Sequence, residues 1–184
     1  MTPPEPEKTS ETAELETLRR TVDELAGRLR AVEDVLAIQQ TIARYGPAVD
    51  AGDDVEVAAL WAEDGRYDAG VGSWTGRDAI AGMVRGPQHQ GFITGGAGHV
   101  VSAPHIVVDG DRAVALCHAQ LLLRDEPADG FRVWRLTANR WELVRTEEGW
   151  RVADRVNRQL DGDAEARRLF GDAIAAGDQA AAEG

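Results

Sequence analysis

Tyr45, Asp50 and His99 are the residues of this chain whose types could together move protons. Tyr45 and Asp50 lie five residues apart where an expected helix ends, and His99 begins an expected strand. A carboxylate that fixes the tautomer of an imidazole makes the imidazole a general base, and a neutral phenol can donate a hydrogen bond to a developing oxyanion. These residue types predict an elimination or a proton shift without metal or cofactor, provided that the fold brings them together.

The composition is that of an acidic globular protein. The chain has 184 residues, of which 43% are hydrophobic and 28% charged, enough for one domain and an extension. Its net charge of -12 argues against a nucleic-acid surface and against an anionic membrane face. No apolar stretch approaches the roughly 20 residues of a membrane span, and the polar, Pro-rich start lacks the apolar core of a signal peptide. We expect a soluble, cytoplasmic protein.

Other kinds of site have weak support in the sequence. The single cysteine, Cys117, excludes an intramolecular disulfide and lies in an apolar run, where a buried and unreactive thiol is expected. The histidines lack the close spacing of metal ligands, so we expect no metal. No phosphate-binding glycine loop, dinucleotide fingerprint or serine nucleophile motif is present. His89 is expected to be solvated and His105 to have a packing or edge role.

The N-terminal part carries a heptad pattern. Residues 1–12 are expected to be disordered, and residues 13–35 to form a helix of coiled-coil type. Its apolar residues alternate spacings of three and four over three heptads: Leu15, Leu18, Val22, Leu25, Leu29, Val32 and Leu36. The pattern favours pairing between chains, in a homodimer or a higher oligomer. The alternative is a helix that packs this stripe on its own domain.

Three further helical segments and a loop are expected before residue 99. The helix can continue through Ile42 to Tyr45, where Pro47 should kink or end it. Asp53 and Glu56 have the spacing of a capping box before a second helix that ends at Gly65. Residues 66–74 suggest a short strand or hairpin, and 77–85 a third helix. The five glycines within 86–98 predict a flexible loop that could act as a lid.

The second half of the chain has the pattern of strands. Strands are expected at 99–108, 112–124, 131–146 and 150–160, joined in pairs by the turn sequences DGD and EEG. Residues 161–184 should form an Ala-rich helix and tail. Helices followed by about four antiparallel strands predict an α+β domain with a pocket between a bent sheet and its helices. Within the strand at 112–124, Val114, Leu116 and Leu122 favour an inward His118 over an inward Cys117.

Four segments of the sequence, within residues 36–160, resemble a known family. They are IARYGPAVDAGDDVEVAALWAEDGRYD (42–68), GRDAI (76–80), HVVSAPHIVVDGDRAVALCHAQL (99–121) and NRWELVRTEEGWRVADRVNR (139–158). Their order resembles the nuclear transport factor 2-like fold, and within it the SnoaL-like group that includes scytalone dehydratase, bile-acid 7α-dehydratase and the lindane dehydrochlorinase. The resemblance implies a cone-shaped α+β domain in which three helices wrap a strongly bent antiparallel sheet.

The resemblance also implies roles for individual residues. Asp50 would orient His99, which would take a proton alpha to a carbonyl or leaving group, while Tyr45 would polarise the substrate oxygen. His118 and Asn139 match a second histidine and an asparagine of scytalone dehydratase, and Arg155 matches a pocket arginine of the dehydrochlorinase. The five tryptophans suit a core, from which one or two could line the pocket of a flat polycyclic substrate; Trp61 is the candidate.

Three functions remain open at this point. The first is a cofactor-independent lyase or isomerase acting on a small hydrophobic carbonyl or polycyclic compound. The second is a non-catalytic binding or assembly subunit, like the small subunit of ring-hydroxylating dioxygenases. The third is an epoxide hydrolase or cyclase built on the same pocket. Fold alone cannot separate them, because one fold of this kind hosts all three.

Overall fold

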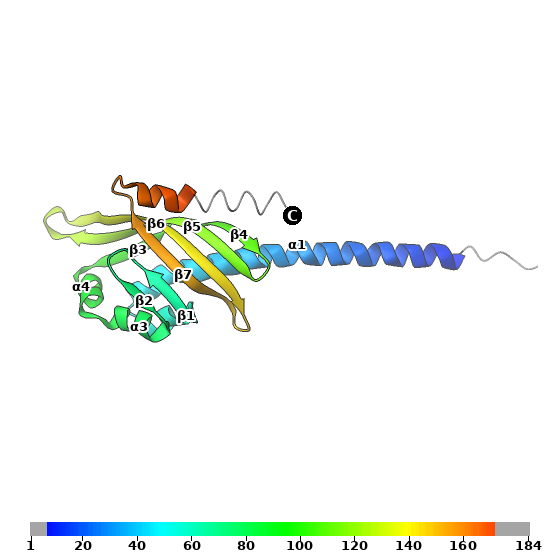
Figure 1. Cartoon of the computed structure of the whole chain (residues 1–184), viewed down its shortest axis with the longest axis horizontal. Coiled ribbons are helices and arrows are strands. Elements are labelled where there is room, and N and C mark those ends of the chain that lie inside the picture. Colours follow the sequence, from blue (N-terminus) through cyan, green and yellow to red (C-terminus); the bar gives the residue numbers. More distant parts are fainter. Residues whose placement is uncertain (1–6, 172–184) are drawn as a thin grey trace, which may run out of the picture. The chain divides into compact units, whose positions relative to one another are not determined.

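The structure is a computed structural model, and it describes residues 7–171. Contacts divide the chain into two compact units, with the boundary between Asp34 and Val35. Helix α1 (Glu7–Asp50) crosses this boundary without a break (Figure 1). It begins inside the range expected to be disordered, so that expectation is wrong for residues 7–12, while residues 1–6 lie outside the described residues.

The C-terminal part of α1 forms one wall of the domain core. Ile38, Ile42, Tyr45 and Val49 are 0–3% exposed and follow the 4-3-4 spacing of one helix face. The helix runs three residues past Pro47, because the turn after the proline is still closed by the Ala51 N–H donating to the Pro47 carbonyl (3.0 Å). This extra turn brings Asp50 to the end of the helix.

Helix α2 (Asp54–Ala59) begins where the capping signal predicts it. The Asp53 side chain accepts the Glu56 backbone N–H at 2.9 Å. The helix ends well before Gly65, however, so the predicted length is wrong. The reason is that Trp61–Asp68 is strand β1, which places Trp61 and Tyr67 in the core. Sheet pairing and burial have overridden a helix-favouring local sequence.

Helices α3 (Arg77–Arg85) and α4 (Pro87–Gly95) follow. The bounds of α3 match the prediction. The expected loop at 86–98 is wrong, because most of it is α4. Pro87 occupies the start of this helix, where its fixed φ and missing N–H are tolerated, and His89 on the helix is buried. Gly91 and Gly95 lower the helix propensity of the segment, which is why its sequence resembles a loop.

A seven-stranded sheet makes up the rest of the domain. Its strands are β1 (Trp61–Asp68), β2 (Ser73–Thr75), β3 (Ala97–Val101), β4 (His105–Asp109), β5 (Arg112–Asp125), β6 (Gly130–Thr146) and β7 (Gly149–Gln159). The order is β2-β1-β7-β6-β5-β3, and β4 also pairs with β5. All pairs are antiparallel except β1 with β7.

The long strands were predicted closely, and the short ones were not. The expected strand at 99–108 is two strands, β3 and β4, separated by a segment that contains Pro104, which has no N–H to give to a ladder.

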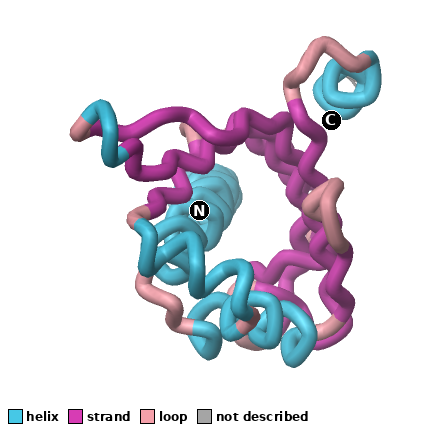
Figure 2. The backbone as a smooth tube through the Cα atoms, turned by 90° about the vertical axis from the view of Figure 1, so that its left-hand side faces the viewer, coloured by secondary structure: helices cyan, strands magenta, loops and turns pink. Residues whose placement is uncertain are grey.

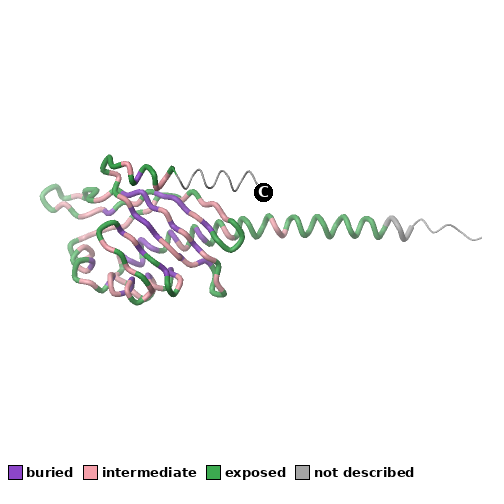
Figure 3. The backbone as a smooth tube through the Cα atoms, viewed as in Figure 1, coloured by how far each residue is buried: buried purple, intermediate pink, exposed green. Residues whose placement is uncertain are grey.

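Figure 2 shows the strands curving round the C-terminal end of α1, with helices closing the remaining side. This confirms the α+β class and the bent sheet. The purple strands of Figure 3 mark the buried core between these layers.

The inner face of β5 is the one that carries small residues. Ala113, Ala115 and Cys117 are buried, whereas His118 is exposed, so the expectation of an inward His118 is wrong. The small side chains leave room for Trp141 on β6, whose ring N–H donates to the Cys117 sulfur at 3.3 Å. Burial also raises the pKa of the Cys117 thiol, as expected for an unreactive cysteine.

The C-terminal segment is helical over 164–171, in agreement with the predicted helix, and the remaining residues lie outside the described part. Among the helices of the described residues, none combines the length and apolar character needed to cross a membrane.

Candidate functional site

Asp50 and His99 form a hydrogen-bonded pair. One carboxylate oxygen, Oδ1, lies 2.6 Å from His99 Nδ1, and the other, Oδ2, accepts the backbone N–H of His99 at 2.8 Å. Two bonds to one residue hold the imidazole in a single orientation. Because the carboxylate is an acceptor, Nδ1 carries the proton and Nε2 is left as the free basic nitrogen. This is the arrangement of a general base with its orienting carboxylate.

The end of α1 and the middle of β3 (Ala97–Val101) must lie very close for this pair to form. Gly46 makes the approach possible, since a Cβ at this position would lie 2.3 Å from the His99 carbonyl oxygen. Asp50 sits at the helix C-terminus, where the helix dipole disfavours a negative charge. Helix stability therefore does not explain an acidic residue at this position. The hydrogen bonds of Asp50 to His99 offset the unfavourable interaction of its charge with the helix dipole.

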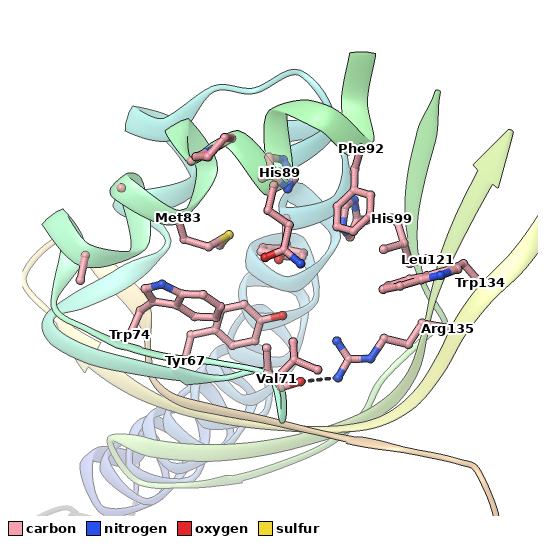
Figure 4. Close-up of a pocket in the computed structure, with 17 residues that line it drawn as sticks. Tyr67, Val71, Trp74, Met83, His89, Phe92, His99, Leu121, Trp134 and Arg135 are labelled. Atoms are coloured by element: carbon pink, nitrogen blue, oxygen red, sulfur yellow. Dashed lines mark hydrogen bonds between the residues drawn. The ribbon is translucent and has the colours of Figure 1, made fainter. Parts of the chain in front are cut away.

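His99 borders a cavity with a volume of about 610 Å³. The cavity lies between the helices and the concave sheet, and Figure 4 shows its walls. Helices α3 and α4 contribute Met83, His89 and Phe92, and the strands contribute aromatic and aliphatic residues and one arginine: Tyr67, Trp74, Leu121, Trp134 and Arg135. A volume of this size suits a compact bicyclic or tricyclic molecule, and the predominance of apolar groups favours a hydrophobic one.

Tyr45 lines both this cavity and a smaller recess beside it. Its ring packs edge-on against the His99 ring, with 6.2 Å between centroids, and is 3% exposed. Burial and the neighbouring phenol of Tyr67 raise the pKa of Tyr45 far above its ordinary value. The phenol therefore remains protonated and can only donate its proton in a hydrogen bond or accept one on its oxygen.

Arg155 is enclosed by aromatic rings. Its guanidinium carbon lies 4.1 Å from the ring centroid of Tyr45, 4.7 Å from that of Tyr67 and 3.9 Å from that of Trp141. Such contacts stabilise a cation by attraction to the ring faces. Its Nε and Nη2 both donate to Asn139 Oδ1, at 3.1 and 2.9 Å.

Arg155 has no carboxylate partner among the described residues, although it is only 2% exposed. Its Nη1 also lacks a hydrogen-bond partner within the described part of the chain. The residue borders a small recess of about 60 Å³ that shares Tyr45, Tyr67, His99 and Arg135 with the large cavity. The recess therefore borders a positive charge that no carboxylate of the described residues neutralises.

His89 is a cavity residue that sequence reasoning placed in solvent. It is 6% exposed, its Nε2–H donates to the Val49 carbonyl at 2.8 Å, and its ring lies 5.6 Å from that of His99. The bond ties α4 to the last turn of α1. A signal was present in the spacing of His89 and Phe92, which share a helix face, but the glycines of this segment hid the helix.

A pH dependence of stability follows from His89. Its burial lowers the pKa below the ordinary value near 6.5, so the folded protein prefers the neutral ring. The unfolded chain then binds the extra proton more readily, and the contribution of His89 to stability is present above about pH 6.5 and lost as the pH falls below it. Thermal unfolding midpoints from pH 8 to pH 5 should fall less steeply in His89→Gln than in the native protein. If the midpoints of the two proteins fell with the same slope, His89 would not be the source of this pH dependence.

The other predicted site residues have supporting or separate positions. Trp61 is fully buried in the core, with its ring edge-on to Tyr45 at 5.9 Å. Asn139 is fully buried beneath Arg155, and its side-chain N–H donates to Thr137 Oγ1 at 2.8 Å. His118 is not brought to this cavity. Its ring packs at a tilt against that of Phe170, with 5.0 Å between ring centroids, beside a different cavity of about 380 Å³.

Ligands for a metal ion are not gathered at this site. Within residues 7–171, no three side chains of the His, Cys, Asp and Glu types lie in a group that could hold one. Asp50 and His99 are instead committed to each other.

Several solved structures share this fold. A nuclear transport factor 2-like protein with a cystatin-like fold from Novosphingobium aromaticivorans is 41% identical, with a TM-score of 0.76 over 79% of this chain and 94% of that one. A protein of unknown function from Mycobacterium tuberculosis is 22% identical, with a TM-score of 0.60 over 79% and 94%. A nuclear transport factor 2-like superfamily protein from Salmonella enterica is 17% identical, with a TM-score of 0.60 over 73% and 98%.

Curated protein sequences provide no match to this chain. A family model does: the SnoaL-like domain matches residues 30–156, which include Tyr45, Asp50, His99, Asn139 and Arg155. The match covers more than half of the chain and agrees with the bent sheet and with the solved structures of similar fold. The chain belongs to the SnoaL-like domain family.

Proposed function

We propose that this protein is a cofactor-independent lyase or isomerase that removes a proton from a carbon next to a carbonyl group. The observation that carries the proposal is the Asp50–His99 pair beside an open cavity of about 610 Å³. A binding or assembly subunit has no need of an oriented imidazole at such a place. The geometry therefore favours an enzyme over that alternative.

His99 is the base in this proposal. With Nδ1–H held by Asp50, its Nε2 accepts the substrate proton, and the Asp50 carboxylate stabilises the imidazolium that results. The same nitrogen can then return the proton to another carbon, which gives an isomerisation, or the carbanion can expel a leaving group, which gives an elimination. Both outcomes begin with the same step.

Tyr45 and Arg155 stabilise the oxygen of the enolate. The phenol stays protonated and can donate a hydrogen bond, and the enclosed guanidinium of Arg155 supplies positive charge that no carboxylate of the described residues offsets. Charge that is already in place where negative charge develops lowers the barrier without reorganisation. The substrate oxygen would lie toward the recess and the hydrocarbon part in the apolar cavity.

The first step can be tested without knowledge of the natural substrate. Bicyclic ketones such as 1-tetralone match the apolar walls and the cavity volume. In D₂O, the protein should accelerate the exchange of the proton alpha to the carbonyl, measured by loss of its NMR signal. Exchange reports proton removal alone, so it does not depend on a leaving group. Ketones that bind, as seen by quenching of tryptophan fluorescence, yet exchange at the uncatalysed rate would contradict the proposal.

Replacing Arg155 with methionine should slow this exchange by about 10²–10³-fold, the usual loss when one preorganised oxyanion donor is removed. Methionine fills the aromatic enclosure and removes a buried charge, so the folded state should persist. Arg151→Met, on the same strand and paired with exposed Glu148, is the matched control and should retain the full rate. An unchanged rate in Arg155→Met, with binding intact, would remove Arg155 from this role.

A further inference from the structure

The N-terminal part of α1 has an apolar stripe that no described residue covers. Its members are 50–65% exposed, although each is a large aliphatic residue (Figure 3): Leu15, Leu18, Val22, Leu25, Leu29, Val32 and Leu36. We call this set the seam. Exposed apolar residues scattered singly are ordinary, but seven in one continuous line mark an interaction surface.

The seam residues are not part of the buried core of the domain. The α1 residues that enter the core are Ile38, Ile42, Tyr45 and Val49. At about 100° per residue, these four lie on nearly the opposite face of the helix from the seam. One helix therefore carries two apolar stripes in succession, and among the described residues only the second is buried in a core.

The charges beside the seam complement a second copy of the same helix. In heptad positions, Leu15, Val22, Leu29 and Leu36 occupy a, while Leu18, Leu25 and Val32 occupy d. The flanking g and e positions five residues apart then hold Glu14 with Arg19, and Arg28 with Glu33. In a parallel pair, each g residue faces the e residue of the other chain, and both of these pairs join opposite charges.

We propose that the seam binds a second copy of this chain in a parallel, in-register, two-stranded coiled coil. The parallel direction of the two helices follows from the numbers of a and d residues in the seam. Parallel pairing puts a against a and d against d, which uses all seven seam residues. Antiparallel pairing puts a against d, and four a residues cannot all be matched by three d residues. One leucine or valine would then face a polar side chain.

The first test is the mass of the full-length protein by light scattering. The native chain should have twice the mass of one chain, and Leu18→Glu combined with Leu25→Glu should return it to the mass of one chain. Thr17→Glu combined with Gly27→Glu adds the same charge outside the seam and should keep the double mass. A native protein with the mass of one chain, or a charged-seam variant that keeps the double mass, would overturn the proposal.

The second test fixes the direction. In the parallel register, the two copies of Leu25 face each other across a d layer, so Leu25→Cys should oxidise to a disulfide-linked dimer. Gly27→Cys, two residues away on the outer face, should remain largely uncrosslinked. In an antiparallel pair, Leu25 would face an a residue instead of its own copy. Equal crosslinking of the two variants, or none at Leu25→Cys, would overturn the parallel arrangement.

Discussion

Replacing His99 with glutamine is expected to reduce the ketone exchange rate by about 10²–10⁴-fold, the usual contribution of a general base. Glutamine can still donate a hydrogen bond to Asp50, but it has no basic nitrogen for the substrate proton. The bond from the His99 backbone N–H to Asp50 should survive, since it does not depend on the ring. Binding of the ketone should therefore be retained, and the loss should lie in the rate of the bound complex.

Asp50→Asn should produce a loss of similar order by a different route. An amide can donate as well as accept, so it no longer requires the proton on His99 Nδ1, and the ring is free to take the wrong tautomer. His105→Gln and Asp109→Asn are the matched controls, because both residues are exposed on β4, away from the cavity. Full exchange activity in either site variant, or equal losses in the controls, would contradict a catalytic dyad.

Gly46→Ala is expected to lower both the stability of the protein and its activity. The new Cβ would lie 2.3 Å from the His99 carbonyl oxygen, a backbone atom that cannot rotate away. Either α1 or β3 must shift, which costs roughly 1–3 kcal/mol of unfolding free energy or more. The shift would also separate Asp50 from His99, since the same two elements carry them. Both the denaturation midpoint and the exchange rate should fall.

The control for this prediction is Gly91→Ala. Gly91 lies in α4 of the same compact unit, and a Cβ there would meet no atom within 4 Å. Alanine in an open helical position should raise stability by up to about 1 kcal/mol, because it favours helix more than glycine does. A Gly46→Ala protein as stable as the native one, with the dyad intact in its crystal structure, would show that the contact between α1 and β3 can relax.

The sequence by itself determined the features that depend on local order. Asp53 and Glu56 marked the start of α2, and the nine residues Arg77–Arg85 formed α3 as predicted. The DGD and EEG sequences formed the expected turns between β4 and β5 and between β6 and β7. These signals are local because capping bonds, helical faces and hairpin turns involve residues a few positions apart. The resemblance of the ordered segments gave the family, which the domain match confirms.

Only the tertiary structure decided which face of each element turns inward. The local sequence around Trp61 favours a helix, yet Trp61 lies in strand β1. The α4 segment has a loop-like sequence, yet it forms a helix in which His89 is buried and bonded to α1. In both cases packing against the rest of the domain outweighs a weak local preference for secondary structure. On β5 both faces are apolar, so alternation could not choose between Cys117 and His118. Cys117 faces inward because its small side chain leaves room for the large ring of Trp141 on the neighbouring strand.

Asp50 and His99 show the same division between local and tertiary information. Their types can be read from the sequence, but 49 positions separate them along the chain. Their pairing depends on the close approach of α1 and β3 at Gly46. The charge of Arg155 beside the small recess likewise depends on which rings enclose it and on the absence of a carboxylate partner among residues 7–171. Sequence spacing contains neither fact, because both arise only when distant strands and helices pack together.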